Sequence, residues 1–186
     1  MSKIIPLPID GSYLITSEIY SDSRGSFREW LPNDAVREIL GSDFPTAQAN
    51  FSISKKGTIR GIHYSSAPEG QAKLVTCLSG SIYDVVVDLR VGSPTFGQWH
   101  GVTLSSNESR SLYLGSGLGH AFMALEDNCG VAYLLSSRFN ADLEFGINPF
   151  DSQINISWPR GNYLLSSKDS QAPMMQDFQT FSKELK

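Results

Sequence analysis

Several side chains that can bind anions or move protons fall within short apolar segments of the sequence. Arg60 and His63 lie in the segment Arg-Gly-Ile-His-Tyr, Lys73 begins the next apolar segment, and His120 follows a glycine-rich turn. Tyr133 lies in a further apolar run. If the faces that carry these residues point inward, one cavity would collect cations, imidazoles and a phenol. The set therefore predicts a binding site for a polar ligand.

Each of these residues has a simpler explanation when it is taken alone. A lysine or arginine at a strand end commonly lies on a solvated edge, and a tyrosine within a strand commonly packs in the core. A buried histidine is more often a hydrogen-bonded structural group than a base. Gln48 and Asn50 add to the case, because they alternate along the preceding strand and share one face. The prediction of a site rests on the whole set.

The histidines and cysteines do not match the patterns of a metal site or a nucleophile. The sequence contains His63, His100 and His120, and no pair is separated by a single residue. His100 follows Trp99 in a strand that we expect to be exposed, and the two remaining, isolated histidines supply too few ligands for a metal ion. Cys77 and Cys129 have no histidine close in sequence, and there is no Gly-x-Ser-x-Gly segment. We therefore expect a site that contains no metal.

The segments around these residues predict an all-β fold. Runs of β-branched and aromatic residues are each closed by Gly, Ser, Asn or Pro, at the spacing typical of a sandwich or barrel. Ser79-Gly80 predicts a hairpin turn, and the nearly continuous apolar run Tyr83–Leu89 predicts a strand covered on both faces. The predicted strands are Ala47–Ser54, Gly57–Ser65, Ala72–Ser79, Ser81–Leu89, Gly97–Leu104, Ser111–Leu114, Ala121–Leu125 and Val131–Ser136.

Helical patterns are few. Asn33–Leu40 predicts a helix that begins at an Asn or Asp N-cap and ends at Gly41. The residues Gln176–Lys186 predict a short C-terminal helix. The last ten or so residues predict a solvated end, within a C-terminal tail expected after about residue 173. No repeat or linker interrupts the chain, so we expect a single domain over residues 1–186.

Composition narrows the class of protein. The chain has 186 residues, with 15 Lys+Arg against 19 Asp+Glu and a formal net charge of −4. This balance argues against nucleic acid as the main partner. No apolar run approaches the ~20 residues that a membrane-spanning helix needs, and the N-terminus lacks the pattern of a signal peptide. We therefore expect a cytoplasmic protein whose two cysteines are reduced and buried.

The order of motifs along the chain resembles one enzyme family closely. The main motifs are Asp22-Ser-Arg-Gly-Ser-Phe-Arg-Glu29, Lys56-Gly-Thr-Ile-Arg-Gly-Ile-His-Tyr64, Asp84-Val-Val-Val-Asp-Leu-Arg90, Gly119-His-Ala-Phe122 and Ile156-Ser-Trp-Pro159. The match runs from about Ile15 to about Pro173, and the chain is similar to the dTDP-4-dehydrorhamnose 3,5-epimerases and to the single-position epimerases of antibiotic deoxysugar pathways. This resemblance implies a cupin-type jelly roll, a homodimer with the N-terminal segment exchanged or packed across it, and no cofactor.

The resemblance implies a dTDP-4-keto-6-deoxyhexose as the substrate. The ketone at carbon 4 acidifies the hydrogens at carbons 3 and 5, so a base can remove one and an acid can return a proton from the opposite face. His63 is the implied base, Asp169 the carboxylate that orients it, and Tyr133 the implied acid. Lys73 is implied near the ketone oxygen, where a cation stabilises the enolate.

The resemblance also implies the residues that bind the nucleotide and the sugar. Arg24 and Glu29 correspond to nucleotide contacts made in part across the dimer, and Phe139 to a ring stacked on thymine. The other implied binding residues are Gln48, Asn50, Arg60, His120 and Glu144.

The sequence departs from the commonest family pattern near the predicted site. Gly115-Ser-Gly-Leu-Gly-His120 stands where Pro-Pro-Gly-Phe-Ala-His is common, and Arg138 stands where a tyrosine is usual. These departures do not decide how many carbons are inverted. We favour inversion at carbons 3 and 5, which leads towards dTDP-L-rhamnose. The alternatives are inversion at carbon 3 or carbon 5 alone, a 3,4-ketoisomerase of the same fold, and a nucleotide-sugar-binding cupin without activity.

Overall fold

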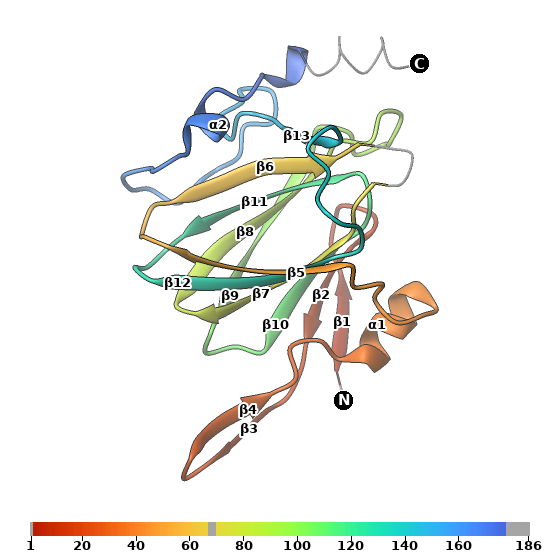
Figure 1. The fold of residues 1–186 in the computed structure, drawn as a ribbon, viewed down its shortest axis with the longest axis vertical. Coiled ribbons are helices and arrows are strands. Elements are labelled where there is room, and N and C mark those ends of the chain that lie inside the picture. The colour runs from red at the N-terminus through yellow and green to blue at the C-terminus, as the bar shows by residue number, and fades with distance from the viewer. Residues whose placement is uncertain (1, 67–69, 178–186) are drawn as a thin grey trace.

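Two antiparallel β-sheets packed face to face form the fold in the computed structural model, which describes residues 2–66 and 70–177 (Figure 1). This arrangement confirms the predicted all-β, cupin-type sandwich. One sheet has the spatial order β1 (Lys3–Pro6), β2 (Ser12–Thr16), β10 (Arg110–Leu114), β7 (Lys73–Ser79), β12 (Cys129–Leu135) and β5 (Gln48–Ser54). The other has the order β13 (Glu144–Gly146), β6 (Ile59–Ser65), β11 (Leu118–Ala124), β8 (Ser81–Asp88) and β9 (Trp99–Ser105).

A two-stranded hairpin stands apart from both sheets. β3 (Ile19–Asp22) pairs only with β4 (Gly25–Arg28), and the hairpin projects from the body of the molecule (Figure 1). Arg28 fixes its base, because its guanidinium donates to the carbonyl oxygens of Ser106, Glu108 and Cys77 at 2.8, 2.6 and 2.8 Å.

The eight predicted strands are all present, with ends that differ by at most three residues. The shift matters most at β11, which begins at Leu118, so His120 lies inside the strand and not at its start. The turn predicted at Ser79-Gly80 joins β7 to β8, with Gly80 at a φ of 72°. The sequence analysis did not identify β1 to β4 or β13, which are five residues long or shorter and lack the apolar runs of the central strands.

The predicted helix over Asn33–Leu40 exists as α1, but its N-cap was assigned wrongly. Pro32 occupies the N-cap position in an extended conformation, and its carbonyl accepts a hydrogen bond from Val36 N at 3.1 Å. The fixed φ of proline suits this position, whereas no side chain caps the helix. Gly41 ends it in the left-handed conformation, as predicted. In the described ranges, every helix is too short or too polar to cross a membrane.

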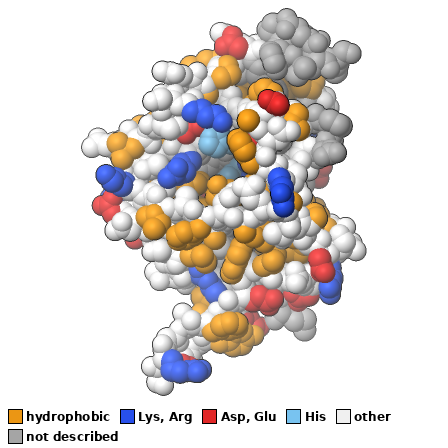
Figure 2. Space-filling view, in the orientation of Figure 1, with side chains coloured by type: hydrophobic (Ala, Val, Ile, Leu, Met, Phe, Trp, Pro, Cys, Tyr) orange, Lys and Arg blue, Asp and Glu red, His pale blue; other side chains and the backbone are white. Residues whose placement is uncertain are grey.

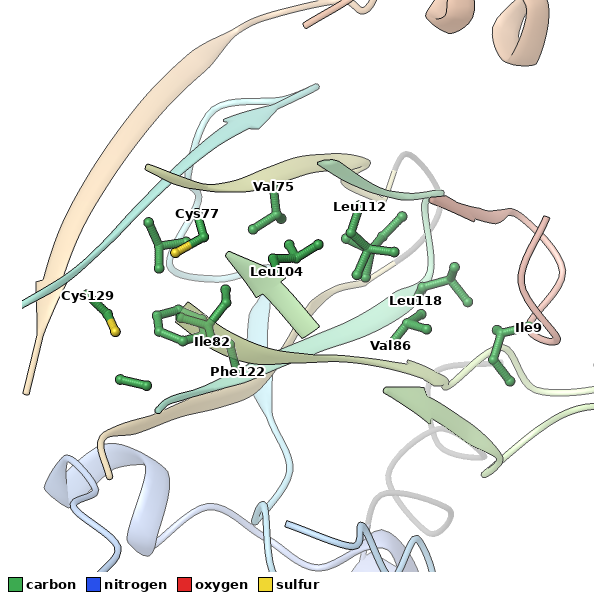
Figure 3. Close-up of a cluster of buried hydrophobic side chains, with 13 residues drawn as sticks. Ile9, Val75, Cys77, Ile82, Val86, Leu104, Leu112, Leu118, Phe122 and Cys129 are labelled. Atoms are coloured by element: carbon green, nitrogen blue, oxygen red, sulfur yellow. The ribbon is translucent and has the colours of Figure 1, made fainter. Parts of the chain in front are cut away.

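Two hydrophobic clusters cover opposite faces of the five-stranded sheet. Between the sheets, Val75 and Leu112 of one sheet face Ile82, Val86 and Phe122 of the other (Figure 3). On the far side of the sheet, Val85 and Val87, the neighbours of Val86 along β8, pack against the C-terminal segment. Residues of that segment in this cluster include Ile147, Ile156, Trp158 and Met175. The prediction that this strand is covered on both faces is therefore confirmed.

The C-terminal segment stays packed against the body of the protein as far as Met175, two residues into the tail expected after about residue 173. Met175 is only 2% exposed, and its backbone N–H donates to Asp151 Oδ2 at 2.8 Å. The Pro173 carbonyl accepts a hydrogen bond from Asn148 N at 2.9 Å. The predicted solvated end, the last ten or so residues, lies almost wholly outside the described residues. Most of the helix predicted over 176–186 lies outside the described residues.

Both cysteines are buried and free, as predicted. Burial raises the pKa of the Cys77 thiol to about 11. The thiolate is therefore scarce at neutral pH, which makes Cys77 a small packing residue and not a nucleophile.

Asp88 anchors the turn that follows β8. Its carboxylate is fully buried and accepts hydrogen bonds from Arg90 Nε at 2.9 Å and from the hydroxyls of Ser93 and Thr95, each at 2.6 Å. Burial by itself raises the pKa of Asp88, but these hydrogen bonds outweigh burial and hold the pKa well below its usual range. The ionised carboxylate fastens the turn to the sheet.

Replacement of this anchor should weaken the fold in a pH-dependent way. Asp88→Asn is expected to lower the free energy of unfolding by about 3 kcal/mol at pH 7, because it breaks a buried ion pair. A lowered folded-state pKa stabilises the protein above the unfolded pKa of ~3.9, and this contribution is lost as the pH falls toward the folded value. Urea unfolding curves of the two proteins should therefore differ at pH 7 and converge in acid. A difference that stays constant with pH would contradict this account of Asp88.

Candidate active site

A cavity of about 520 Å³ is lined by strands of both sheets. β6 and β11 line it from the five-stranded sheet, and β5, β7 and β12 from the six-stranded sheet. On the molecular surface, histidine side chains lie in a hollow bordered by cationic and apolar side chains (Figure 2). Ten of the twelve predicted site residues line the cavity: Gln48, Asn50, Arg60, His63, Lys73, His120, Tyr133, Phe139, Glu144 and Asp169.

His63 and Asp169 form a hydrogen-bonded pair at this cavity. His63 Nε2 lies 2.6 Å from Asp169 Oδ1, although the two residues are 106 positions apart in sequence. Burial raises the pKa of Asp169, but hydrogen bonds from His63, Ser166 and the Gly61 backbone outweigh burial and lower it. The ionised carboxylate accepts the Nε2 hydrogen and so leaves the lone pair of a neutral imidazole on Nδ1. This is the arrangement of a general base with an orienting carboxylate.

Asp169 reaches this position from a single helical turn, α2 (Ser167–Ser170). Ser166 caps the turn, since its hydroxyl oxygen accepts a hydrogen bond from Asp169 N at 3.0 Å. The turn lies beside β6 at the top of the view in Figure 1. The pair therefore joins the C-terminal segment to the middle of a sheet.

Gly61 allows β6 to approach its neighbours closely at this point. Its φ of 111° is one that L side chains rarely adopt, and a Cβ there would lie 2.8 Å from the Ala121 Cβ on β11. The register between β6 and β11 shifts in the same region, between His120 and Phe122. A residue without a side chain is thus required two positions before His63, where its N–H also bonds to Asp169.

Lys73 places an ammonium group inside the fold, on the six-stranded sheet. The residue is only 6% exposed, and Nζ donates to the carbonyl oxygen of His63 at 3.4 Å. Burial lowers the pKa of Lys73, whereas the nearby carboxylates of Glu144 and Asp84 act in the opposite direction. Nζ offers three hydrogens, so it can also donate to a ligand in the cavity.

Tyr133 lines the cavity from β12, on the sheet opposite His63. Its strand lies between β7 and β5, and it pairs in register with Val75 and Asn50. A phenol and an imidazole therefore approach the same space from opposite sheets. A ligand held between them presents one face to each group, which is the geometry that proton removal and return on opposite faces needs.

His120 belongs to a second histidine–carboxylate pair. Its Nε2 lies 2.5 Å from Oδ1 of Asp84, a fully buried residue on β8. The other carboxylate oxygen, Asp84 Oδ2, is buried and has no hydrogen-bond partner. The sequence analysis missed the role of Asp84, although an aspartate within the apolar run Tyr83–Leu89 was a signal of a buried polar contact.

The amide side chains of β5 organise one wall of the cavity. Gln48 Nε2 donates to Asn50 Oδ1 at 2.9 Å, and Gln48 Oε1 accepts a hydrogen bond from Phe139 N at 3.0 Å. Gln48 therefore holds the loop that carries Phe139, whose side chain is 58% exposed. Arg60 lies at the rim, where Nε donates to Ser54 Oγ at 3.1 Å. Glu144 Oε1 is buried without a hydrogen-bond partner.

Arg24 and Glu29 do not line this cavity. Arg24 lies at the tip of the projecting hairpin, where it pairs with Asp22 at 2.6 Å and remains 88% exposed in its side chain. Glu29 follows β4 and is also exposed. Within one chain, these two predicted residues are separate from the other ten.

Several lining residues were not predicted at all. Leu164, Leu165, Ser166 and Lys168 come from the C-terminal segment, and Thr58, Phe122, Leu135 and Phe145 come from strands or their ends. Nothing in the spacing of the C-terminal residues indicates that this segment folds back onto β6. Among the described residues, no three His, Cys, Asp or Glu side chains cluster as metal ligands would.

Comparisons with known proteins agree with this geometry. Residues 6–177 match the family model of dTDP-4-dehydrorhamnose 3,5-epimerase. A dTDP-4-dehydrorhamnose 3,5-epimerase from Mycolicibacterium smegmatis is 45% identical over 174 residues, which cover 93% of this chain and 86% of the relative. The crystal structure of a 4-keto-6-deoxy sugar epimerase from the novobiocin gene cluster of Streptomyces spheroides matches with a TM-score of 0.95 and 42% identity, and covers 98% of this chain and 92% of that one.

A single-position epimerase is also similar. The structure of a double mutant of a 3′-monoepimerase from Streptomyces bikiniensis, in complex with dTDP, matches with a TM-score of 0.91 and 40% identity, over 95% of this chain and 89% of that one. Its two replaced residues are a histidine and a tyrosine, separated by the same number of residues as His63 and Tyr133.

Fold, site and similarity together define the protein as a carbohydrate epimerase, an isomerase built on a cupin-type sandwich. The chain belongs to the dTDP-4-dehydrorhamnose 3,5-epimerase family. The resemblance noted from the sequence motifs is therefore confirmed.

The requirement for a glycine two positions before His63 can be tested directly. Gly61→Ala should reduce the free energy of unfolding by about 2 kcal/mol or more, because it forces an unfavourable φ and a clash with β11. Gly57→Ala is a poor control, since its Cβ would clash as well, whereas Gly92→Ala meets no atom within 4 Å at a similarly positive φ. Thermal unfolding should show a clearly larger loss for Gly61→Ala than for Gly92→Ala. Equal losses would mean that close packing at Gly61 is unimportant.

Proposed function

We propose that this protein epimerises dTDP-4-keto-6-deoxyglucose at carbons 3 and 5 and so forms dTDP-4-keto-L-rhamnose. The observation that carries the proposal is the His63–Asp169 pair, which shares one cavity with Tyr133 on the opposite sheet. Solved family members bind the same class of ligand, since a relative from Legionella pneumophila is in complex with dTDP-4-keto-L-rhamnose.

In this proposal, His63 is the base. Its Nδ1 removes the proton from carbon 3 or carbon 5. The electron pair of the broken C–H bond then spreads over that carbon, carbon 4 and the ketone oxygen, which forms the enolate. Asp169 stabilises the imidazolium that forms and holds the ring in place. The low pKa of Asp169 supports this role, because the carboxylate stays ionised while His63 carries the proton.

Tyr133 is the proposed acid. It gives a proton to the opposite face of the same carbon, which restores the ketone and inverts the centre. The phenol O–H is the donor that this step needs. The buried ammonium of Lys73 is proposed to face the ketone oxygen, where it stabilises the enolate in both half-reactions.

The remaining cavity residues are proposed to hold the nucleotide and the sugar. Arg60 at the rim suits a phosphate through its fixed fork of donors, and the exposed ring of Phe139 suits stacking on thymine. Gln48, Asn50, His120 and Glu144 are proposed sugar contacts. The buried oxygen of Glu144 without a partner supports this assignment, since a sugar hydroxyl would satisfy it.

Inversion at carbon 3 alone is the second candidate function. The similarity to a 3′-monoepimerase favours it, because that relative carries a histidine and a tyrosine at the same separation as this chain. The pair of residues is therefore compatible with one inversion or two. The position of the sugar ring between His63 and Tyr133 decides whether carbon 5 also comes within reach.

Proton NMR in deuterated water separates these functions. With dTDP-4-keto-6-deoxyglucose, deuterium should enter at carbons 3 and 5, because solvent deuterons replace the hydrogens of the base and the acid. His63→Ala should slow exchange at both carbons by about 10²–10⁴-fold, the usual contribution of a general base. Tyr133→Phe should slow inversion by a similar factor while exchange by His63 continues. His100→Ala is the matched control, since His100 does not line the cavity.

The outcomes of this experiment are distinct. Deuterium at carbon 3 alone would replace the double inversion with the single one. No exchange at either carbon, with the nucleotide sugar still bound, would overturn the proposal and favour a ketoisomerase or a binding protein.

We also propose that the protein is a homodimer in which the hairpin β3–β4 packs on the partner. A two-stranded hairpin alone is at best marginally stable in water, yet this one carries Tyr20 and Phe27 with exposures of 59% and 70%. Apolar side chains also cross the face of the molecule near β5, where Phe51 and Ile53 are 59% and 62% exposed (Figure 2). A second copy would cover these residues and would bring Arg24 and Glu29 towards a nucleotide.

Light scattering tests the dimer. The wild type should have twice the mass of the chain, about 41 kDa from 20.4 kDa, and Phe27→Asp should reduce it to the mass of a monomer, because a buried unpaired charge is costly. Val91→Asp is the control, since Val91 is similarly exposed at 56% but lies in a loop far along the chain from the hairpin. A monomeric wild type would contradict the dimer and the shared nucleotide site.

A further inference from the structure

The segment that carries Asp169 is tied to the sheet by Asn148, a buried residue that does not line the cavity. Asn148 Nδ2 donates to the Ser170 carbonyl at 3.1 Å, and Asn148 N donates to the Pro173 carbonyl at 2.9 Å. Its Oδ1 accepts a hydrogen bond from Phe150 N at 2.9 Å. Asn148 therefore bonds to the C-terminal segment at two places, through its side chain at Ser170 and through its backbone at Pro173.

Asn148 is in turn fixed to the strand that carries His63. The residue before it, Ile147, exchanges two backbone hydrogen bonds with Ile62, at 3.0 and 3.2 Å. Ile62 precedes His63, and Ser170 follows Asp169. The contacts thus form a closed ring, from His63 through its side chain to Asp169, along the backbone to Ser170, across to Asn148, and back through Ile147 and Ile62.

We propose that Asn148 is a positioning residue for the base, which holds the Asp169 carboxylate at hydrogen-bond distance from His63. Asp169 lies on a helix of four residues, which is too short to hold itself in place. The Ser166 cap acts only within that turn. The Asn148 amide instead links the turn to β6, at the residue next to the carboxylate. The inference rests on the proposed function, because it takes the His63–Asp169 pair as the base.

A second tie lies further along the segment. Asp151 is 3% exposed, and Oδ2 accepts from Met175 N at 2.8 Å while Oδ1 accepts from Gln153 N and Ile154 N at 2.8 Å each. Asp151 holds the end of the segment, six residues from Asp169. It therefore secures the end of the segment, whereas Asn148 acts at the residue next to Asp169 and adds to the bonds that the carboxylate itself receives from His63 and the Gly61 backbone.

Kinetics of epimerisation test this role. Asn148→Ala should lower kcat by about 10–100-fold with a change in KM of less than about threefold, because a displacement of about 1 Å at a catalytic group costs rate and not binding. Asn148→Asp is a second variant that keeps the shape and the acceptor for Phe150 N but lacks the donor to Ser170. It should show the same loss, and it serves if Asn148→Ala does not fold.

A double-mutant cycle separates positioning from general damage. If Asn148 acts through Asp169, then Asn148→Ala should have little further effect on kcat in an Asp169→Asn background. Val36→Ala is the stability control, because Val36 is a fully buried residue of α1 and does not line the cavity. It should lower the melting temperature and leave kcat unchanged. The inference would be overturned if Asn148→Ala lowered kcat by the same factor in the Asp169→Asn background as in the wild type. It would also be overturned if Asn148→Ala lowered kcat no more than Val36→Ala does.

A measurement that needs no substrate tests the positioning role of Asn148 separately from the proposed epimerase activity. The Nε2 proton of His63, donated to a carboxylate, should give a downfield proton resonance in protein labelled with ¹⁵N-histidine. The resonance should be lost in Asp169→Asn, shifted or broadened in Asn148→Ala, and unchanged in Val36→Ala. Such a result with no epimerase activity would leave Asn148 as the positioning residue of the pair and overturn the proposed function alone. An unchanged resonance in Asn148→Ala, or none in the wild type, would overturn the inference.

Discussion

The hydrogen bond between His63 and Asp169 is the constraint on which the rest of the architecture depends. It joins a central strand to a segment more than a hundred residues later, so the chain must bring the two within 2.6 Å. The packing of Ile147, Trp158 and Met175 against Val85 and Val87 serves this end, because it fixes the C-terminal segment to the outer face of the five-stranded sheet. Gly61 then removes the side chain that would keep β6 from its neighbours. The packing of the C-terminal segment on the sheet therefore also determines the geometry of the site.

Several features of the cavity are unfavourable for stability and become reasonable only with a ligand. Lys73 is buried and pays a desolvation penalty that lowers its pKa, and carboxylate oxygens of Asp84 and Glu144 lie buried without hydrogen bonds. A purely structural interior would satisfy or avoid such groups. Lys73 and Glu144 line the cavity, and Asp84 bonds to the lining residue His120. This end of the sandwich thus differs from the apolar interior shown in Figure 3, where the two sheets meet through apolar side chains.

The strands and most of the cavity residues could be predicted because their signals are local. Gln48 and Asn50 alternate along β5 as predicted, with Phe51 and Ile53 on the opposite face, and the Arg-Gly-Ile-His motif marks β6 without reference to other segments. Asp84 and Asn148 could not be assigned in this way, since their partners come from other parts of the chain. The burial of Met175 could not be predicted for the same reason, since a single apolar side chain gives no periodic pattern and its cover comes from distant strands.

The origin of Asp169 in the last part of the described chain has a consequence for how the enzyme comes into being. All the strands precede this residue, so both sheets can form on a nascent chain while the carboxylate partner of His63 is still within the ribosome. A polypeptide that stops short of the segment would lack Asp169, the cavity residues Leu164, Leu165, Ser166 and Lys168, and the apolar side chains that cover the outer face of the five-stranded sheet. The His63–Asp169 pair, one wall of the cavity and the cover of the sheet therefore form together, in the step in which this segment packs onto β6.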